Sequence, residues 1–254
     1  MLNIIGIIKA AVLNGTPLLF GTSGEILTQK SGNMNLGVEG LMFMGGAFGL
    51  AGAFTYSNVA GEAASGAIAI IIAILCAFTA GFLGSLIFSF LTVTLKANQN
   101  VTGLALTIFG TGVGQFVGEI MRIKIGGNVT IPNALKNAFV NPVMPEFLRK
   151  IPFVGELLFS YNLFVYIGVV MVIVMHYFLN KTRKGLNLRA VGESPATADA
   201  AGINVTRYRY LATCIGGGIS ALGGMIYIMT ISGCVWNYSA LSGEGWIAVA
   251  LVIF

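Results

Sequence analysis

Two acidic side chains, Glu25 and Glu39, stand at or near the ends of long apolar runs. A carboxylate at the middle of a bilayer costs about 3 kcal/mol on insertion scales, so each needs an interfacial position, a polar cavity or a cation. The sequence offers Lys30, or an arginine of the basic segment described below, as that cation. We favour structural ion pairing for both glutamates, with Asn35 in the same polar group, and keep a direct role in transport as the alternative.

A second polar cluster, at Asn98 and Gln99, comes immediately before another apolar run. Asparagine is among the preferred residues at the N-terminal cap of a helix, where its side chain accepts from free backbone N–H groups. We interpret both residues as an interfacial cap of the following helix rather than as ligands of a substrate.

The sequence contains no motif of a metal site or of a phosphate-binding loop. Cys76, Cys214 and Cys234 lie far apart, without a CxxC pair or a histidine cluster, which argues against a metal site or a disulfide framework. The phosphate-binding motif GxxxxGKS or GxxxxGKT is absent from the sequence, and that motif is what cradles the phosphates in one large class of ATPases. We expect no metal and no cofactor on this chain, so ATP, if used, is bound by partner subunits.

The segment 181–209 holds six of the fourteen Lys and Arg residues and lies between two apolar runs. Basic loops of membrane proteins are retained on the cytoplasmic side. Within the segment, Ser194 can cap a helix, Pro195 suits its first position and Gly202 suits its end. We predict a helix of about seven residues, roughly 10 Å long. Large apolar anchors for lipid are missing, so its small side chains suit a groove on a soluble partner.

Composition places the chain in the membrane class. Hydrophobic residues make up 56% of the chain, charged residues 9%, and the mean hydropathy is +0.86, whereas a soluble domain carries about 25% charged residues. The positive residues behind the net charge of +5 lie in loops between apolar runs, so we expect no nucleic-acid partner. We predict an all-α, polytopic transmembrane helix bundle with spans at 4–27, 36–56, 66–95, 101–121, 161–180 and 210–232.

Two of the apolar runs have unusual lengths. The run at 66–95 is long enough to be strongly tilted or to contain a break, since a span needs about 20 residues. The run WIAVALVIF stops at Phe254, part-way through a further span. We therefore expect residues 1–254 to form a single transmembrane domain that is truncated at its C-terminal end.

Charge predicts the orientation of these spans. With 181–209 in the cytoplasm, eight basic residues lie inside and five lie in the 122–160 segment outside, in agreement with the positive-inside rule. The 122–160 segment also holds four of the six prolines, which favours short or irregular helices there. It is either a solvated loop over the helix ends or a dock for an extracytoplasmic binding protein, and the sequence leaves both open.

Small residues at four-residue spacing indicate close helix packing. A glycine every fourth residue brings helix backbones together within a membrane. One such line is Gly110, Gly114 and Gly118, and a second is Gly216, Ser220 and Gly224. We predict static packing at both.

Three segments resemble one family of transporters. They are GEILTQKSGNMNLGVEGLMFMGGAFG, LKANQNVTGLAL and KGLNLRAVGESPATADAAGINVTRYRYLA. In order and spacing they are similar to permease subunits of ABC importers of the branched-chain amino acid, ribose and nucleoside group. Within that group the chain looks most like the nucleoside (simple-sugar) permeases that work with basic-membrane-type lipoproteins.

The resemblance implies a type II ABC importer fold in the cytoplasmic membrane and a transport subunit rather than an enzyme. It implies two cytoplasmic ATPase subunits, a second permease subunit of a different sequence and an extracytoplasmic solute-binding lipoprotein. It also implies that 194–202 is the helix that couples to the ATPase, through Ser194, Pro195, Ala198, Asp199, Ala200 and Gly202. The lead-in to that helix consists of Gly185, Leu186, Arg189, Ala190, Gly192 and Glu193.

The main alternative is a self-contained secondary transporter driven by an ion gradient. Such proteins show interrupted helices with intramembrane acids that face a cavity, whereas the acids here fall near span ends. A passive channel or membrane scaffold is a third possibility. A neighbouring ATPase gene and a second permease gene would distinguish the ABC importer from both.

Overall fold

Each of the six predicted spans is a long helix in the computed structural model, which describes residues 4–149, 151, 154–241 and 243–254. The six are α1 (Ile4–Gln29), α2 (Val38–Ala60), α3 (Gly66–Ser89), α4 (Gln99–Ile125), α8 (Leu163–Lys181) and α11 (Val205–Ile226). Lys150 and Pro152, both predicted to belong to the 122–160 segment, lie outside the described residues.

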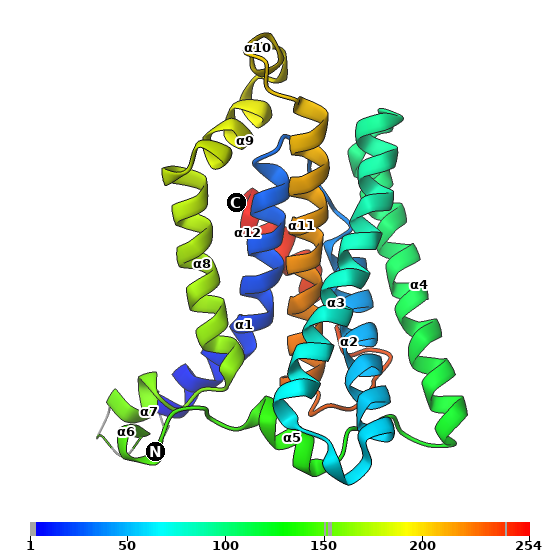
Figure 1. Cartoon of the computed structure of the whole chain (residues 1–254), viewed down its shortest axis with the longest axis vertical. Helices are drawn as coiled ribbons and strands as arrows, with labels where there is room; N and C mark the ends of the chain where they lie inside the picture. The colour runs from blue at the N-terminus through cyan, green and yellow to red at the C-terminus, as the bar shows by residue number, and fades with distance from the viewer. Residues whose placement is uncertain (1–3, 150, 152–153, 242) are drawn as a thin grey trace.

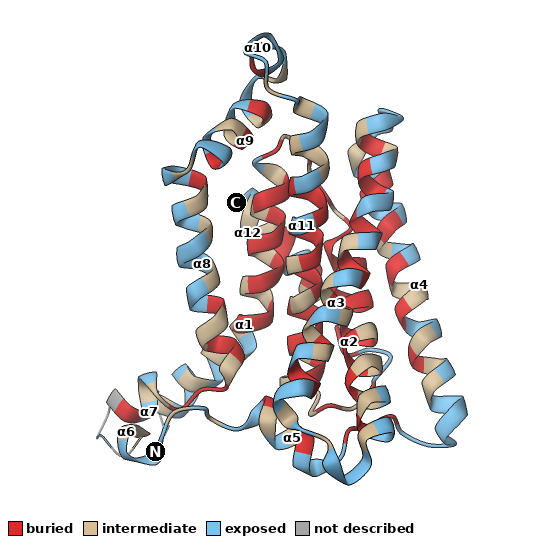
Figure 2. Cartoon of the chain, viewed as in Figure 1, coloured by how far each residue is buried: buried red, intermediate tan, exposed pale blue. Residues whose placement is uncertain are grey.

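The described residues form no β-strand, and only an isolated bridge joins Thr130 to Val235. The chain is therefore an all-α, multi-pass membrane protein, as the composition predicts. The α2 and α11 helices are the most buried, while α3, α4 and α8 expose long apolar faces (Figure 2). Exposed faces of this kind are the surfaces that a bilayer or another membrane subunit covers.

The α4 and α11 helices begin a few residues before the predicted spans, because a polar cap extends each of them beyond its apolar run. The α4 helix begins after Asn98, and α11 begins after Asn204, whose side chain accepts from the Arg207 N–H at 2.9 Å. Past Ser89, α3 continues as a π-helical turn, Phe90–Thr94. The long third run is thus helical without a break through Thr94, and only its last turn is π-helical.

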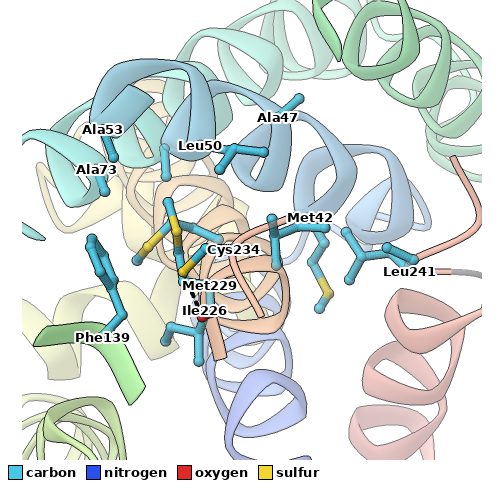
Figure 3. Packing of buried hydrophobic residues seen from close by; sticks show 14 of the residues in the cluster. Met42, Ala47, Leu50, Ala53, Ala73, Phe139, Ile226, Met229, Cys234 and Leu241 are labelled. Carbon is cyan, nitrogen blue, oxygen red and sulfur yellow. Dashed lines mark hydrogen bonds between the residues drawn. The ribbon is translucent and has the colours of Figure 1, made fainter. Parts of the chain in front are cut away.

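The core lies where α2, α11 and the residues after α11 meet. Met42 and Leu50 of α2 pack with Ile226 and Met229, and Phe139 closes the cluster from another helix (Figure 3). All five side chains are at most 1% exposed. The core is therefore built from the most interior helices.

The glycine line of α4 lies against the N-terminal half of α2. A Cβ atom at Gly110 would stand 2.6 Å from the Gly40 backbone, and one at Gly114 would stand 2.6 Å from the Phe43 ring. Gly118 packs on the Trp236 ring instead. Because none of these contacts leaves room for a Cβ atom, the line allows the close approach of α4.

The line on α11 contacts two different helices. Gly216 lies against the Gly24 carbonyl of α1, and the Ser220 hydroxyl donates to the Gly21 carbonyl of α1 at 3.1 Å. Gly224 lies against the backbone of Met42 in α2. The α11 helix is thus in close contact with both α1 and α2.

Short helices mark the two ends of the bundle. At one end, called here the α5 end, lie α5 (Asn133–Val140), α6 (Glu146–Arg149) and α7 (Val154–Leu158) (Figure 1). At the opposite end, called here the α10 end, lie α9 (Arg183–Glu193) and α10 (Pro195–Ala200). The 122–160 and 181–209 segments therefore occupy opposite ends, and the proline-rich one forms short helices as predicted.

After α11 the chain turns back into the bundle. A π-helical turn, Tyr227–Ile231, ends α11. The next residues reach the α5 end, where the backbone N–H of Trp236 donates to the Val129 carbonyl at 3.1 Å. The chain then returns to α12 (Glu244–Ile253), a short apolar helix that packs against α1 and α2. We refer to residues 232–241 with Gly243 as the return segment.

Candidate functional site

The α10 end carries a pair of helices rather than the single helix predicted within 181–209. The first, α9, begins after Thr182, whose hydroxyl accepts from the Gly185 N–H at 3.0 Å. All six residues predicted as the lead-in to the coupling helix, from Gly185 to Glu193, belong to α9. This helix escaped prediction because its residues are largely polar and show no clear apolar stripe, so neither hydropathy nor periodicity marks it.

Two glycines of α9 make close backbone contacts. A Cβ atom at Gly185 would overlap the carbonyl oxygen of Phe178, at the corner between α8 and α9. A Cβ atom at Gly192 would overlap the carbonyl oxygen of Lys30 and stand 3.1 Å from the Gly32 nitrogen. The helix is therefore held against α8 at its start and against the loop after α1 at its end.

The other predicted lead-in residues face outward or support the corner. Arg189 donates to the Asn180 side chain at 3.3 Å, and the Ala190 carbonyl accepts the Ser194 N–H at 2.9 Å. Leu186, Ala190 and Glu193 are exposed. The outward face of α9 is thus available to a partner.

The structure places α10 where the cap residues predicted a helix. Pro195 occupies its first turn, and Gly202 has φ +79° and donates to the Asp199 carbonyl at 2.8 Å. Ser194 stands at the N-cap position, but its hydroxyl bonds the Thr197 hydroxyl at 2.7 Å and not a backbone N–H. Ala198 is the buried residue of this helix, while Asp199 and Ala200 are exposed.

A buried polar junction lies where α1 passes into α2, in residues 30–37. Glu25 of α1 is 2% exposed, and its carboxyl accepts the Asn35 N–H at 2.8 Å. The Asn35 side chain in turn accepts the Gly37 N–H at 2.8 Å. Glu25 and Asn35 therefore satisfy the backbone of a loop that is buried within the bundle.

Two further helices hold the same loop. Asn33 donates to the Thr213 hydroxyl of α11 at 3.0 Å. Gln99 of α4 accepts the Met34 N–H at 2.8 Å. Asn98 caps α4 by accepting from the Asn100 and Val101 amides at 3.0 and 3.2 Å. The prediction that both residues cap α4 is therefore confirmed for Asn98 only. Gln99 instead binds the loop between α1 and α2.

Glu39, in the first turn of α2, contacts the N-terminus of α12. Its carboxyl accepts the Gly243 N–H at 2.9 Å and the Gly245 N–H at 2.6 Å. The first amides of a helix lack intrahelical partners and carry partial positive charge, so a carboxyl group there is favourable. Glu39 thus fixes the point at which the return segment becomes α12.

The expected ion pairs of Glu25 and Glu39 are wrong. In the described part of the chain, the one ion pair joins Arg122 to Glu119 on α4, at 2.8 Å. Both buried carboxyls are satisfied by backbone amides, which avoids the desolvation of a cation inside the bundle. The sequence could not indicate the partners of Glu39, because they lie 204 and 206 positions further along the chain.

Potential metal ligands are not clustered in the described part of the chain. Among the described residues, no group of three His, Cys, Asp or Glu side chains lies close enough to bind a metal ion.

Six apolar helices, a buried polar junction and an exposed helix pair at one end define a multi-pass membrane protein. Residues 7–254 match the family described as the permease component of the branched-chain amino acid transport system. The chain belongs to this family. It is a permease subunit of the ABC importer type in the cell membrane, and the family does not support an ion-driven secondary transporter.

Three relatives are similar over nearly the whole chain. A putative glucose ABC transporter permease of Haloferax volcanii is 34% identical over 98% of this chain and 70% of its own length. The guanosine ABC transporter permease of Bacillus subtilis is 33% identical, over 98% of this chain and 74% of its own. A nucleoside ABC transporter permease of Lactococcus lactis is 31% identical, over 100% and 77%. No solved structure matches the chain.

Proposed function

We propose that this chain forms part of the pathway by which an ATP-driven importer carries nucleosides or related sugars across the cytoplasmic membrane. The observation that carries the proposal is α10, a short, exposed helix at one end of a bundle of six apolar helices. A helix that projects from the membrane helices, with small side chains on its outer face, suits a groove on an ATPase subunit.

We place the α10 end in the cytoplasm. The six basic residues of the 181–209 segment support this orientation, because positive residues near span ends are retained inside. The α5 end is then external. The 122–160 segment there remains a candidate dock for a solute-binding lipoprotein, with a solvated cover over the helix ends as the alternative.

The partners in this proposal are two cytoplasmic ATPase subunits, a second permease subunit of a different sequence and an extracytoplasmic solute-binding lipoprotein. The long apolar faces of α3, α4 and α8 provide surface for lipid and for the second permease subunit. ATP is hydrolysed by the ATPase subunits, and this chain contributes the pathway and the docking helix.

A neutral solute fits the interior better than an ion. The two buried carboxyls, Glu25 and Glu39, are both occupied by backbone amides. The names of the relatives point in the same direction, since they specify guanosine, nucleosides and glucose. We therefore propose nucleosides as the first choice and simple sugars as the second.

The test is uptake by cells that depend on this system. Deletion of the gene should abolish uptake of labelled guanosine, and unlabelled glucose and leucine serve as competitors in the intact strain. Loss of labelled leucine uptake with guanosine uptake intact would overturn the choice of solute. Purification of the membrane complex should recover an ATPase subunit, and a chain that purifies alone and transports without ATP would overturn the ABC assignment.

A further inference from the structure

A continuous set of contacts leads from α9 into the interior of the bundle. It begins at Gly192, which packs on the backbone at Lys30 and Gly32 with no intervening side chain. Two backbones in direct contact cannot relax as flexible side chains do. A displacement of α9 would therefore press directly on the loop 30–37.

The loop 30–37 links α9 to several membrane helices. Three buried or half-buried hydrogen bonds anchor it, one to each of α1, α4 and α11: Asn35 to Glu25 at 2.8 Å, Met34 to Gln99 at 2.8 Å and Asn33 to Thr213 at 3.0 Å. The residues that follow enter α2 directly at Val38. A movement of the loop would therefore displace the first turn of α2.

Glu39 lies in that first turn and joins α2 to the return segment. Its carboxyl binds the amides of Gly243 and Gly245, and its backbone packs on Gly245 so closely that a Cβ atom there would overlap the Glu39 Cα. At its other end the return segment reaches the α5 end, through the 3.1 Å bond from Trp236 to Val129 and the bridge between Val235 and Thr130. The contacts thus connect the two ends of the bundle.

We propose that Glu39 is the positioning residue through which displacement of α9 and α10 controls the return segment and α12. The proposal rests on the proposed function, because it takes the α10 end as the ATPase dock. A buried carboxyl is a costly way to fill space within a membrane bundle. It is suited to hold two chain segments by hydrogen bonds that can break and reform during a transport cycle.

Spatial continuity alone does not establish energetic coupling, so the first experiment measures coupling in the reconstituted complex with its ATPase and binding-protein partners. Glu39→Gln keeps the shape of the side chain but replaces one accepting oxygen with an amide donor. We expect normal assembly and basal ATP hydrolysis, with loss of the stimulation by loaded binding protein and uptake lower by about tenfold or more. The matched control is Glu62→Gln, which changes an exposed carboxyl just beyond the far end of α2.

The second experiment perturbs the opposite end of the contacts. Gly192→Ala places a methyl group against the Lys30 carbonyl, whereas Gly15→Ala, with nothing within 4 Å, is the control. We expect Gly192→Ala to speed hydrogen exchange at the Gly243 and Gly245 amides by about tenfold, although it changes no residue near them. If Gly192 only packs locally, exchange at the Gly243 and Gly245 amides will be unchanged. That result would contradict the proposal.

Combining the two substitutions separates transmission from general damage. If both substitutions act on one transmission step, stimulation of ATP hydrolysis in the double variant is no lower than in the more severe single variant. If they act independently, the two losses of stimulation multiply.

Normal stimulation and uptake in Glu39→Gln would overturn the proposal even if the ATPase partners bind. Failure of the unmodified chain to recover an ATPase subunit refutes the proposed function instead, so the two failures are distinguishable. If Glu39→Gln does not accumulate, the exchange measurement on Gly192→Ala decides the question alone.

Discussion

Gly224 of α11 lies directly on the backbone of Met42 in α2, so close that a Cβ atom at position 224 would overlap the Met42 carbonyl oxygen. Both residues belong to the most buried part of the bundle, where Met42 is 0% exposed. The contact is between two backbones, so no side-chain rotation can relieve an added methyl group. The separation of the two central helices is thus set by a glycine.

We predict that Gly224→Ala destabilises the bundle. Overpacking of a well-packed interior costs about 1–3 kcal/mol, so the melting temperature in detergent should fall by several degrees and the membrane level should decrease. Gly112→Ala is the matched control, because nothing lies within 4 Å of a Cβ atom at that position of α4. Equal melting temperatures for the two variants would show that the α2–α11 contact tolerates expansion.

Features set by local sequence were predictable. Asn98, Pro195 and Gly202 act on their immediate neighbours, and the structure has a cap or a helix end at each of them. Apolar runs of about 20 residues likewise predicted the spans, because the bilayer thickness fixes their length.

Features that depend on distant partners were not predictable. The ion pairing expected of Glu25 and Glu39 was wrong because backbone amides supply the partners. A single sequence carries no sign of which amides will approach a carboxyl. The α9 helix was missed for a different reason, since its capping and its contacts with α8 and the 30–37 loop define it more than its hydropathy.

The orientation predicts opposite labelling of the two ends by an impermeant thiol reagent. In a chain without native cysteines, Asn137→Cys at the α5 end should react in intact cells, whereas Ser194→Cys should react only after lysis. Both positions are exposed, so burial does not explain a difference. The reverse pattern would overturn the assignment of the α10 end to the cytoplasm.

Cys234 should be inert in such an experiment even when it is retained. It is 0% exposed, and burial raises the pKa of its thiol to about 11, well above its ordinary value. The reactive thiolate is therefore scarce at neutral pH, and it becomes appreciable only as the pH approaches that pKa. A variant that keeps Cys234 alone should show no labelling at pH 7 before denaturation and full labelling after it. Rapid labelling of the folded chain would show that the return segment opens at the α5 end.

The last prediction concerns the exposed face of α10. Ala200→Glu adds bulk and a charge to a side chain that faces solvent in this chain, so the permease itself should fold and insert normally. At a packed contact with an ATPase subunit the same charge must lose its hydration, which costs several kcal/mol unless it finds a partner. A loss of that size weakens docking by a few powers of ten. We therefore expect normal membrane levels, with loss of ATPase co-purification and of uptake. Ala134→Glu, an equal change at an exposed position of α5, should retain the ATPase. If Ala200→Glu retains its ATPase and transports as well as the control, α10 is not the docking helix.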